Sequence, residues 1–231
     1  MQKILIANWK MNGSKDLVDG YADALRGTTS DYGVVCCPPV TVIDYAYGQL
    51  PSFVSLGAQD CSKFDSGAQT GEVCCSMLRE IGCSHVIVGH SERRRSQNEN
   101  DAVVQGKAEI VQKYGMTPIV CIGESLDEYR NRETLQVLER QLGYLAQASK
   151  GHLIVAYEPV WAIGTGETPS IEEISKVHRF IKEKSGATTV YGGSVTLDNY
   201  KSIIALNEVD GVLVGGESLK IDRFSSMLRG L

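Results

Sequence analysis

Eight short runs of apolar and β-branched residues recur along the chain, and segments long enough to be helices separate them. The runs are ILIAN from Ile4, GVVCC from Gly33, FVSLGA from Phe53, HVIVG from His85, PIVCIG from Pro118, HLIVAY from His152, TTVYGG from Thr188 and VDGVLVGG from Val209. Strands that are apolar throughout are buried on both faces, and helical connections between them favour a parallel arrangement. The alternation therefore predicts a parallel sheet covered by helices.

Three of the connecting segments have apolar residues at every third or fourth position, which is the period of an amphipathic helix. They run from Lys107 to Tyr114, from Leu135 to Ala148 and from Ile171 to Lys184. Eight β-then-α units without a low-complexity linker predict one α/β domain over residues 1-231, a (β/α)8 TIM barrel of eight parallel strands ringed by helices. An open doubly wound sheet is the alternative.

The charge balance and the N-terminus disfavour nucleic acid and membrane partners. There are 23 basic and 28 acidic residues, and the one dense basic run, Arg93 to Arg95, follows Glu92 and is interpreted as a charged helix start. The apolar stretch before Asn8 is too short for a signal peptide, and no run reaches the ~18 apolar residues of a membrane span. We expect a cytoplasmic protein.

The seven cysteines do not form a pattern typical of a disulfide framework or a zinc site. Their number is odd, no CxxC spacing occurs, and two pairs are adjacent, Cys36 with Cys37 and Cys74 with Cys75. We expect reduced and mostly buried thiols. The absence of Walker A, GxGxxG and HExxH patterns also disfavours nucleotide, dinucleotide and thermolysin-type zinc chemistry.

Polar residues at the ends of the strands are the candidates for chemistry, because barrel active sites lie at the carboxyl ends of the strands. After the first run, Asn8 and Lys10 are two positions apart, so they point the same way, because strand side chains alternate with period two. If that way is inward, they bring an amide and a cation into the site together. The alternative is a solvated lysine at a strand end.

The fourth run ends in a histidine that we expect to be neutral. Val86, Val88 and His90 would share one face of the strand, and Ser91 is the candidate cap of a following helix. The positive end of a helix dipole disfavours an imidazolium, so His90 would act as a neutral hydrogen-bond donor. A purely structural histidine is the alternative.

The sixth run ends in a carboxylate beside a glycine-bearing apolar loop. Ile154, Ala156 and Glu158 share one face, Pro159 ends the strand, and the loop spans residues 160-166. A loop that excludes water would raise the pKa of Glu158 and make it more basic. A solvated strand-end carboxylate is the alternative.

Glycine pairs follow the last two runs. Gly192 and Gly193 precede Ser194, and Gly215 and Gly216 follow the eighth run. Glycines at these adjacent strand ends let backbone N–H groups approach an anion, at the usual phosphate position of this fold. Simple turns are the alternative.

Taken together, six segments resemble the triosephosphate isomerase family in order and spacing over nearly the whole chain. They are NWKMN at Asn8, GHSERR at Gly89, CIGE at Cys121, AYEPVWAIGTG at Ala156, YGGSV at Tyr191 and GVLVGG at Gly211. The resemblance implies interconversion of dihydroxyacetone phosphate and D-glyceraldehyde 3-phosphate through an enediolate, in glycolysis and gluconeogenesis, with no metal and no organic cofactor.

The resemblance also implies a role for each candidate residue. Glu158 would be the catalytic base and His90 the neutral electrophile, with Lys10 and Asn8 assisting. The phosphate would bind at Gly164, Ser194, Gly215 and Gly216. Tyr191 and Ser194 would latch the closed loop, and Glu92 would lie behind His90 and Lys10.

A homodimer is implied as well, through residues 57-72, which are similar to the family's protruding loop; Thr70 would enter the neighbouring subunit. A long surface loop is the alternative. The chain departs from the family pattern at five positions: Asp60, Gln69, Glu167, Pro169 and Glu217.

Two other functions compete with the isomerase. The first is another phosphate-binding barrel, such as an epimerase or a synthase, which would not need Lys10, His90 and Glu158 in these contexts. The second is a catalytically silent barrel that binds sugar phosphates or protein partners. Loss of any of the three residues would have favoured it, and all three are present.

Overall fold

Eight parallel strands close into a barrel in the computed structural model, which describes residues 2–148, 152–164 and 167–230. Each strand pairs with the next in sequence, and β8 pairs with β1. The strands are β1 Ile4–Asn8, β2 Gly33–Cys37, β3 Val54–Ala58, β4 Cys83–Val88, β5 Thr117–Ile122, β6 Ile154–Tyr157, β7 Thr188–Tyr191 and β8 Gly211–Val214. The predicted barrel is confirmed, and the open doubly wound sheet is excluded.

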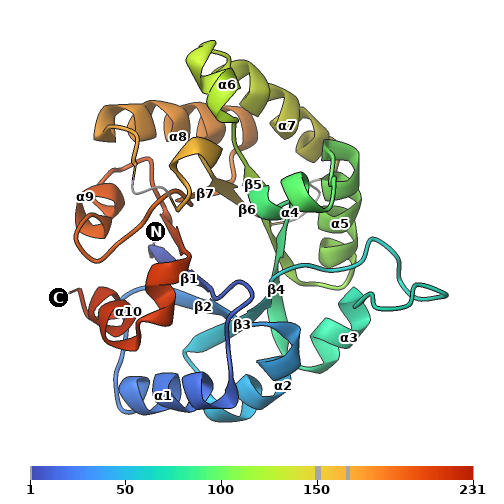
Figure 1. Ribbon diagram of the computed structural model, residues 1–231, viewed down its shortest axis with the longest axis vertical. Helices are drawn as coiled ribbons and strands as arrows, with labels where there is room; N and C mark the ends of the chain where they lie inside the picture. Colours follow the sequence, from blue (N-terminus) through green and yellow to red (C-terminus); the bar gives the residue numbers. More distant parts are fainter. Residues whose placement is uncertain (1, 149–151, 165–166, 231) are drawn as a thin grey trace.

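Helices form a ring outside the strands (Figure 1). The α-helices are α1 Lys15–Leu25, α2 Val40–Gln49, α3 Cys75–Glu80, α4 Ser91–Ser96, α5 Asp101–Lys113, α6 Leu126–Arg130, α7 Thr134–Ala148, α8 Ile171–Ser185, α9 Tyr200–Ile204 and α10 Ile221–Leu228. Two 3-10 turns are η1 Val160–Ala162 and η2 Gly216–Leu219. The three predicted helices correspond to α5, α7 and α8; α5 starts earlier than predicted because the Asn100 side chain caps it by accepting from the Val103 N–H.

Two apolar layers alternate along each strand. Residues such as Ile6, Ile87 and Leu213 form a cluster inside the barrel, whereas neighbours such as Leu5 and Val88 belong to the cluster between strands and helices. All seven cysteines are buried, as expected. The barrel is therefore a packed core, and the chemistry must lie at one of its ends.

A loop between β3 and α3 extends away from the barrel (Figure 1). Its neck is closed by a hydrogen bond from the Ser62 N–H to the Val73 carbonyl, 2.8 Å long. Thr70 is exposed near its tip. Among the described residues, no helix has the length and apolar character needed to span a membrane.

Candidate active site

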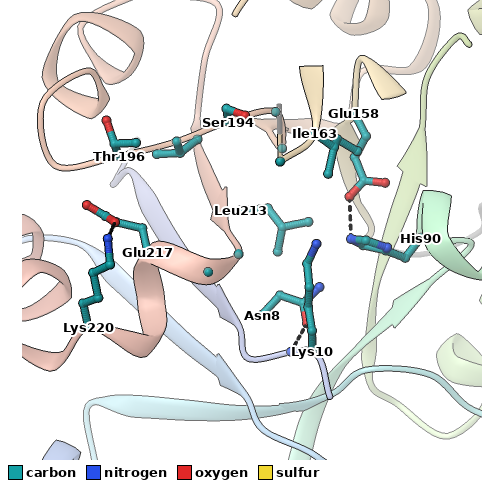
Figure 2. Close-up of a pocket in the computed structure, with 16 residues that line it drawn as sticks. Asn8, Lys10, His90, Glu158, Ile163, Ser194, Thr196, Leu213, Glu217 and Lys220 are labelled. Carbon is teal, nitrogen blue, oxygen red and sulfur yellow. Dashed lines mark hydrogen bonds and ion pairs between the residues drawn. The ribbon is translucent and has the colours of Figure 1, made fainter. Parts of the chain in front are cut away.

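A cavity of about 410 Å³ opens at the carboxyl ends of the strands (Figure 2). It brings together eight of the residues predicted from sequence: Asn8, Lys10, His90, Glu158, Gly164, Ser194, Gly215 and Gly216. Glu92 and Tyr191 are not among the residues that line it. Glu92 instead contacts Lys10 from behind, and Tyr191 is buried at the end of β7.

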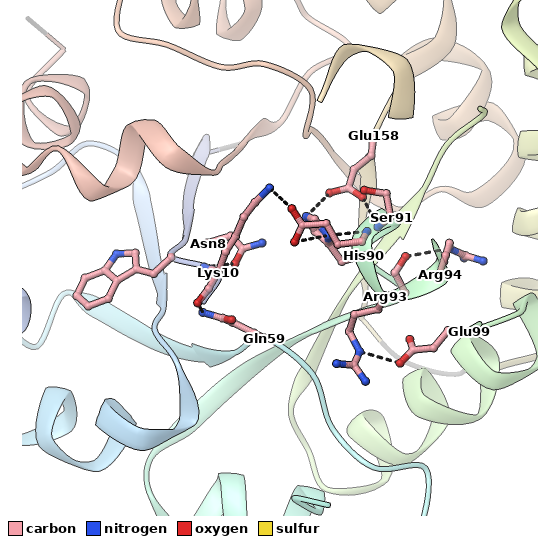
Figure 3. A network of polar contacts seen from close by, with 12 residues as sticks. Asn8, Lys10, Gln59, His90, Ser91, Arg93, Arg94, Glu99 and Glu158 are labelled. Atoms are coloured by element: carbon pink, nitrogen blue, oxygen red, sulfur yellow. Dashed lines mark hydrogen bonds and ion pairs between the residues drawn. The ribbon is translucent and has the colours of Figure 1, made fainter. Parts of the chain in front are cut away.

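The turn after β1 holds Lys10 in a left-handed conformation with a φ of 54°. The Asn8 side-chain oxygen accepts from the Lys10 N–H at 3.0 Å, and the Gln59 amide donates to the Lys10 carbonyl at 2.8 Å. The Lys10 ammonium lies 2.6 Å from Glu92 Oε1 (Figure 3). Strained backbone of this kind persists only where surrounding contacts fix it, and it is common at functional sites.

His90 reaches the cavity by a route that the sequence pattern did not predict. Val86 and Val88 pack against the helices, so the strand alternation alone would turn His90 outward. Gly89 follows β4 directly and has a φ of 68°, a left-handed conformation that ends the extended strand. The predicted shared face of Val86, Val88 and His90 is therefore wrong, because alternation ends where the strand ends.

The predicted cap of α4 is also displaced by one residue. His90 is the N-cap, and its Nδ1 accepts from the Glu92 N–H at 3.2 Å, while Ser91 is the first residue of the helix. A nitrogen that accepts a backbone N–H carries no proton, so the neutral ring has its proton on Nε2. That nitrogen is 3.0 Å from Glu158 Oε1.

Glu158 is buried at the end of β6, on the inner face with Ile154 and Ala156. Its Oε2 accepts from the Ser91 N–H at 3.0 Å (Figure 3). Oε1 has no well-aligned hydrogen-bond donor among the described residues. One carboxylate oxygen is therefore held in place, and the other remains able to accept a proton.

The pKa values of this pair differ in direction from the predictions. Burial raises the pKa of Glu158, but His90, the Ser91 N–H and Lys10 together lower it below its usual value. Burial opposes a charge on His90, yet the neighbouring Glu158 carboxylate raises the His90 pKa. The helix dipole and the apolar loop suggested the opposite shifts, because the sequence does not show that these two side chains meet.

Two glycines that line the cavity lie so close to neighbouring side chains that an added Cβ would force these neighbours to shift. A Cβ on Gly192 would lie 3.0 Å from Glu158 Cγ, and one on Gly215 would lie 3.2 Å from Lys10 Cε. The Glu158 and Lys10 side chains therefore occupy the space that these two glycines leave open. Ser194 Oγ donates to the Ala162 carbonyl and so connects the β7 loop to η1.

The loop after β6 is described as far as Gly164, which has a φ of 70°, and again from Glu167. Thr165 and Gly166 of the predicted loop lie outside the described residues. Pro169 is buried beside Trp161, in a small cavity of about 110 Å³. The two ends of the loop therefore meet the same pocket.

Sequence reasoning gave no role to Glu124, although it lies in the CIGE segment. It is fully buried, and its Oε1 accepts from Trp161 Nε1 at 2.9 Å and from the Tyr157 hydroxyl at 3.1 Å. Glu124 thereby anchors the start of the loop beside Glu158. The available signal was its place as an acid just beyond an apolar strand, the same position that identified Glu158.

Within the described part of the chain, no three His, Cys, Asp or Glu side chains are arranged to hold a metal ion. The arrangement offers a carboxylate, an imidazole, an ammonium group and several glycines around one cavity. Such a set is suited to moving a proton next to a carbonyl group while the charge on oxygen is stabilised.

Residues 3–231 match the family described as triosephosphate isomerase. The triosephosphate isomerase of Alkalilimnicola ehrlichii is 44% identical over 99% of this chain and 98% of its own length. That of Halorhodospira halophila is 43% identical over 98% and 96%, and that of Alcanivorax borkumensis is 41% identical over 96% and 95%. The similarity extends over almost all of each chain.

Proposed function

The chain belongs to the triosephosphate isomerase family, and on that premise we propose that it interconverts dihydroxyacetone phosphate and D-glyceraldehyde 3-phosphate. This is an intramolecular aldose–ketose isomerisation, shared by glycolysis and gluconeogenesis. The observation that carries the proposal is the Glu158 carboxylate, which is buried, lines the cavity and has its Oε1 3.0 Å from His90 Nε2. The cytoplasm is the proposed compartment.

Glu158 is the proposed base. Its Oε1 takes the proton from the carbon next to the carbonyl, and the electron pair of that C–H bond moves to form the enediolate double bond. The same carboxyl group then returns the proton to the neighbouring carbon. The hydrogen bond from the Ser91 N–H to Oε2 keeps the group in position for both transfers.

His90 and Lys10 are the proposed stabilisers of the enediolate oxygens. A neutral imidazole with its proton on Nε2 can donate to the oxygen, and the Lys10 ammonium supplies a positive charge. Glu92 holds Lys10 and also donates its N–H to His90 Nδ1, so one residue orients both donors. Asn8 fixes the Lys10 backbone.

The substrate phosphate is proposed to bind the backbone N–H groups of Gly164, Ser194, Gly215 and Gly216, which line the other side of the cavity. Tyr191 and Ser194 are the proposed latch of the loop after β6. Ser194 already bonds to the Ala162 carbonyl in that loop, and the Tyr191 hydroxyl has no partner among the described residues.

A coupled assay with glyceraldehyde 3-phosphate tests the function. We expect activity in the wild type and a loss on the order of a hundredfold in Glu158→Asp, because the shorter side chain moves the base by roughly 1 Å. Glu139→Asp is the matched control, since Glu139 is an exposed glutamate paired with Lys184 on the outer helices. An inactive wild type would favour a silent sugar-phosphate-binding or interaction barrel, and an active Glu158→Asp would remove Glu158 from its role.

The protein is also proposed to be a homodimer through the loop around Thr70. Large apolar side chains are exposed on and near that loop, at Met11, Phe64 and Met77, and the family resemblance assigns this loop to a neighbouring subunit. Sedimentation at micromolar concentration should give about twice the chain mass of 25.1 kDa. A fully active species of the chain mass would contradict this. Nucleic acid and membranes are not proposed as partners.

A further inference from the structure

An acidic residue stands next to the proposed phosphate position. Glu217 directly follows Gly216 in η2 and lines the cavity on the side opposite His90 and Glu158 (Figure 2). Its side chain is only 7% exposed. A buried carboxylate next to a bound dianion would weaken binding unless nearby cations neutralise it.

Two cations from the following segment neutralise Glu217. Its Oε2 accepts from Lys220 Nζ at 2.9 Å, and its Oε1 accepts from Arg223 Nε. Burial raises the pKa of Glu217, but the hydrogen bonds from Lys220 and Arg223 lower it below its usual value. The group is therefore an ionised acceptor whose own segment fixes its orientation.

The third contact of Glu217 crosses between two loops. Oε1 also accepts from the Leu197 N–H at 3.3 Å. Leu197 belongs to the loop after β7, whereas Glu217 belongs to the loop after β8. This hydrogen bond thus joins the two loops that line the phosphate side of the cavity.

The β7 loop transmits this attachment to Ser194. The Asn199 side chain accepts from the Thr196 N–H at 2.8 Å and donates to the Ser194 carbonyl at 2.9 Å. The segment from Ser194 to Asn199 is thereby tied together on both sides of Leu197. The hydrogen bond from the Leu197 N–H to Glu217 therefore also restrains the position of Ser194.

From these contacts we propose that Glu217 is a positioning residue that joins the β7 and β8 loops, so that the N–H groups of Ser194, Gly215 and Gly216 keep the spacing a phosphate dianion requires. Backbone donors bind an anion well only if their directions are fixed before it arrives. Glu217 supplies that fixation without touching the substrate. The inference rests on the proposed function for the substrate, but phosphate binding can be measured without turnover.

The primary test measures the dissociation constant of inorganic phosphate by titration calorimetry, together with KM and kcat. In Glu217→Ala we expect the phosphate dissociation constant and KM to rise by about tenfold, while kcat changes by less than about threefold. A general loss of folding would lower kcat and the Tm together. Phosphate affinity equal to or tighter than wild type would overturn the proposal, because Glu217 would then only screen Lys220 and Arg223.

Three further variants separate position from charge. Glu217→Gln keeps an oxygen for the Leu197 N–H and should stay within about threefold of wild type. Glu217→Asp keeps the charge but withdraws it by roughly 1 Å, and should weaken phosphate binding. The control Asp198→Ala removes the other acid that pairs with Arg223, at 2.9 Å, and should change nothing.

If Glu217→Ala does not fold, Glu217→Asp still tests whether Glu217 positions the two loops. Unchanged phosphate affinity in the aspartate variant would contradict the proposal. A glutamine variant that falls as far as the alanine variant would contradict it too. A wild type without isomerase activity would instead defeat the proposed function, and the phosphate constants would still decide the role of Glu217.

Discussion

Two groups of four titratable side chains lie at the carboxyl end of the barrel and share the start of α4. The first, the site group, consists of Lys10, His90, Glu92 and Glu158. The second, the loop-base group, consists of Asp60, Arg93, Glu99 and Lys107. Figure 3 shows Glu158 and His90 of the first near Arg93 and Glu99 of the second. Each group combines two acids with two basic side chains. The ion-pair contacts form a closed ring in the loop-base group and an open chain in the site group.

The loop-base group is a closed ring. Lys107 Nζ lies 2.7 Å from both Asp60 and Glu99, and Arg93 completes the ring with contacts of 2.8 Å to Asp60 and 2.7 Å to Glu99. Every side chain has two oppositely charged neighbours. The ring fastens the protruding loop to α4 and α5.

The site group is an open chain. It runs from Lys10 through Glu92 and His90 to Glu158, and both ends line the cavity. Lys10 Nζ contacts one carboxylate, and Glu158 Oε1 has no well-aligned donor among the residues described. A closed ring of ion pairs therefore leaves every charge paired and stabilises the fold. An open chain of ion pairs leaves its end groups at the cavity, where they can contact a substrate.

The largest expected effect comes from removing the charge at one end of the site group, at Lys10. Lys10→Met should lower kcat/KM by at least about a hundredfold, with KM raised and kcat lowered together, because the charge meets both the substrate and the enediolate. Steady-state kinetics measure the effect. Lys184→Met, at an exposed lysine paired with Glu139, is the control. A change in Tm alone would assign Lys10 to structure.

Breaking the ring should affect stability instead. Lys107→Met leaves two acids with a single cation and should lower the free energy of unfolding by about 3–5 kcal/mol. At denaturant concentrations below the unfolding transition, its kcat should stay within about twofold of the wild-type value. Denaturant unfolding at fixed protein concentration measures the loss. Asp60→Asn keeps a hydrogen-bonding side chain and should cost less, about 1 kcal/mol. A large fall in kcat with unchanged stability would reverse the comparison.

The smallest effect is a change in titration. The pKa of Glu158 should lie below its usual value of 4.5 in the ligand-free protein. The substitution His90→Ala should raise the pKa of Glu158, because fewer contacts then oppose the effect of burial. Because the folded-state pKa is depressed, ionised Glu158 contributes stability above that usual value and loses it as the pH falls. Carbon NMR of the carboxyl groups, assigned with Glu158→Gln, measures both pKa values. A lower pKa in His90→Ala would contradict the account.

The sequence predicted the barrel because its signal is local and repeated. Each strand is a short apolar run, and the order of the strands follows the order of the runs. Glu158 was placed on the inner face for a sound reason, since alternation persists to the end of β6. His90 reached the cavity for a different reason, the left-handed Gly89, which no periodicity reveals.

The contacts between distant segments could not be predicted in this way. Asp60 and Lys107 are 47 positions apart, and Glu158 meets the Ser91 N–H across 67 positions. A pattern along the chain indicates which face a residue occupies but not its partner on another strand. The same limit explains why the directions of the pKa shifts at Glu158 and His90 were wrong.

Because every cysteine is buried, the reactivity of the thiols can report on local and global unfolding of the protein. Burial raises the pKa of Cys83 to about 12 and also raises the pKa values of Cys37 and Cys121, so these thiols are shielded and hardly form the thiolate that reacts. Their labelling by a thiol reagent must wait for the structure around them to open. Cys37 and Cys121 lie inside the barrel, whereas Cys61 and Cys75 flank the protruding loop. The order in which they react would rank the free energies at which loop and barrel come apart.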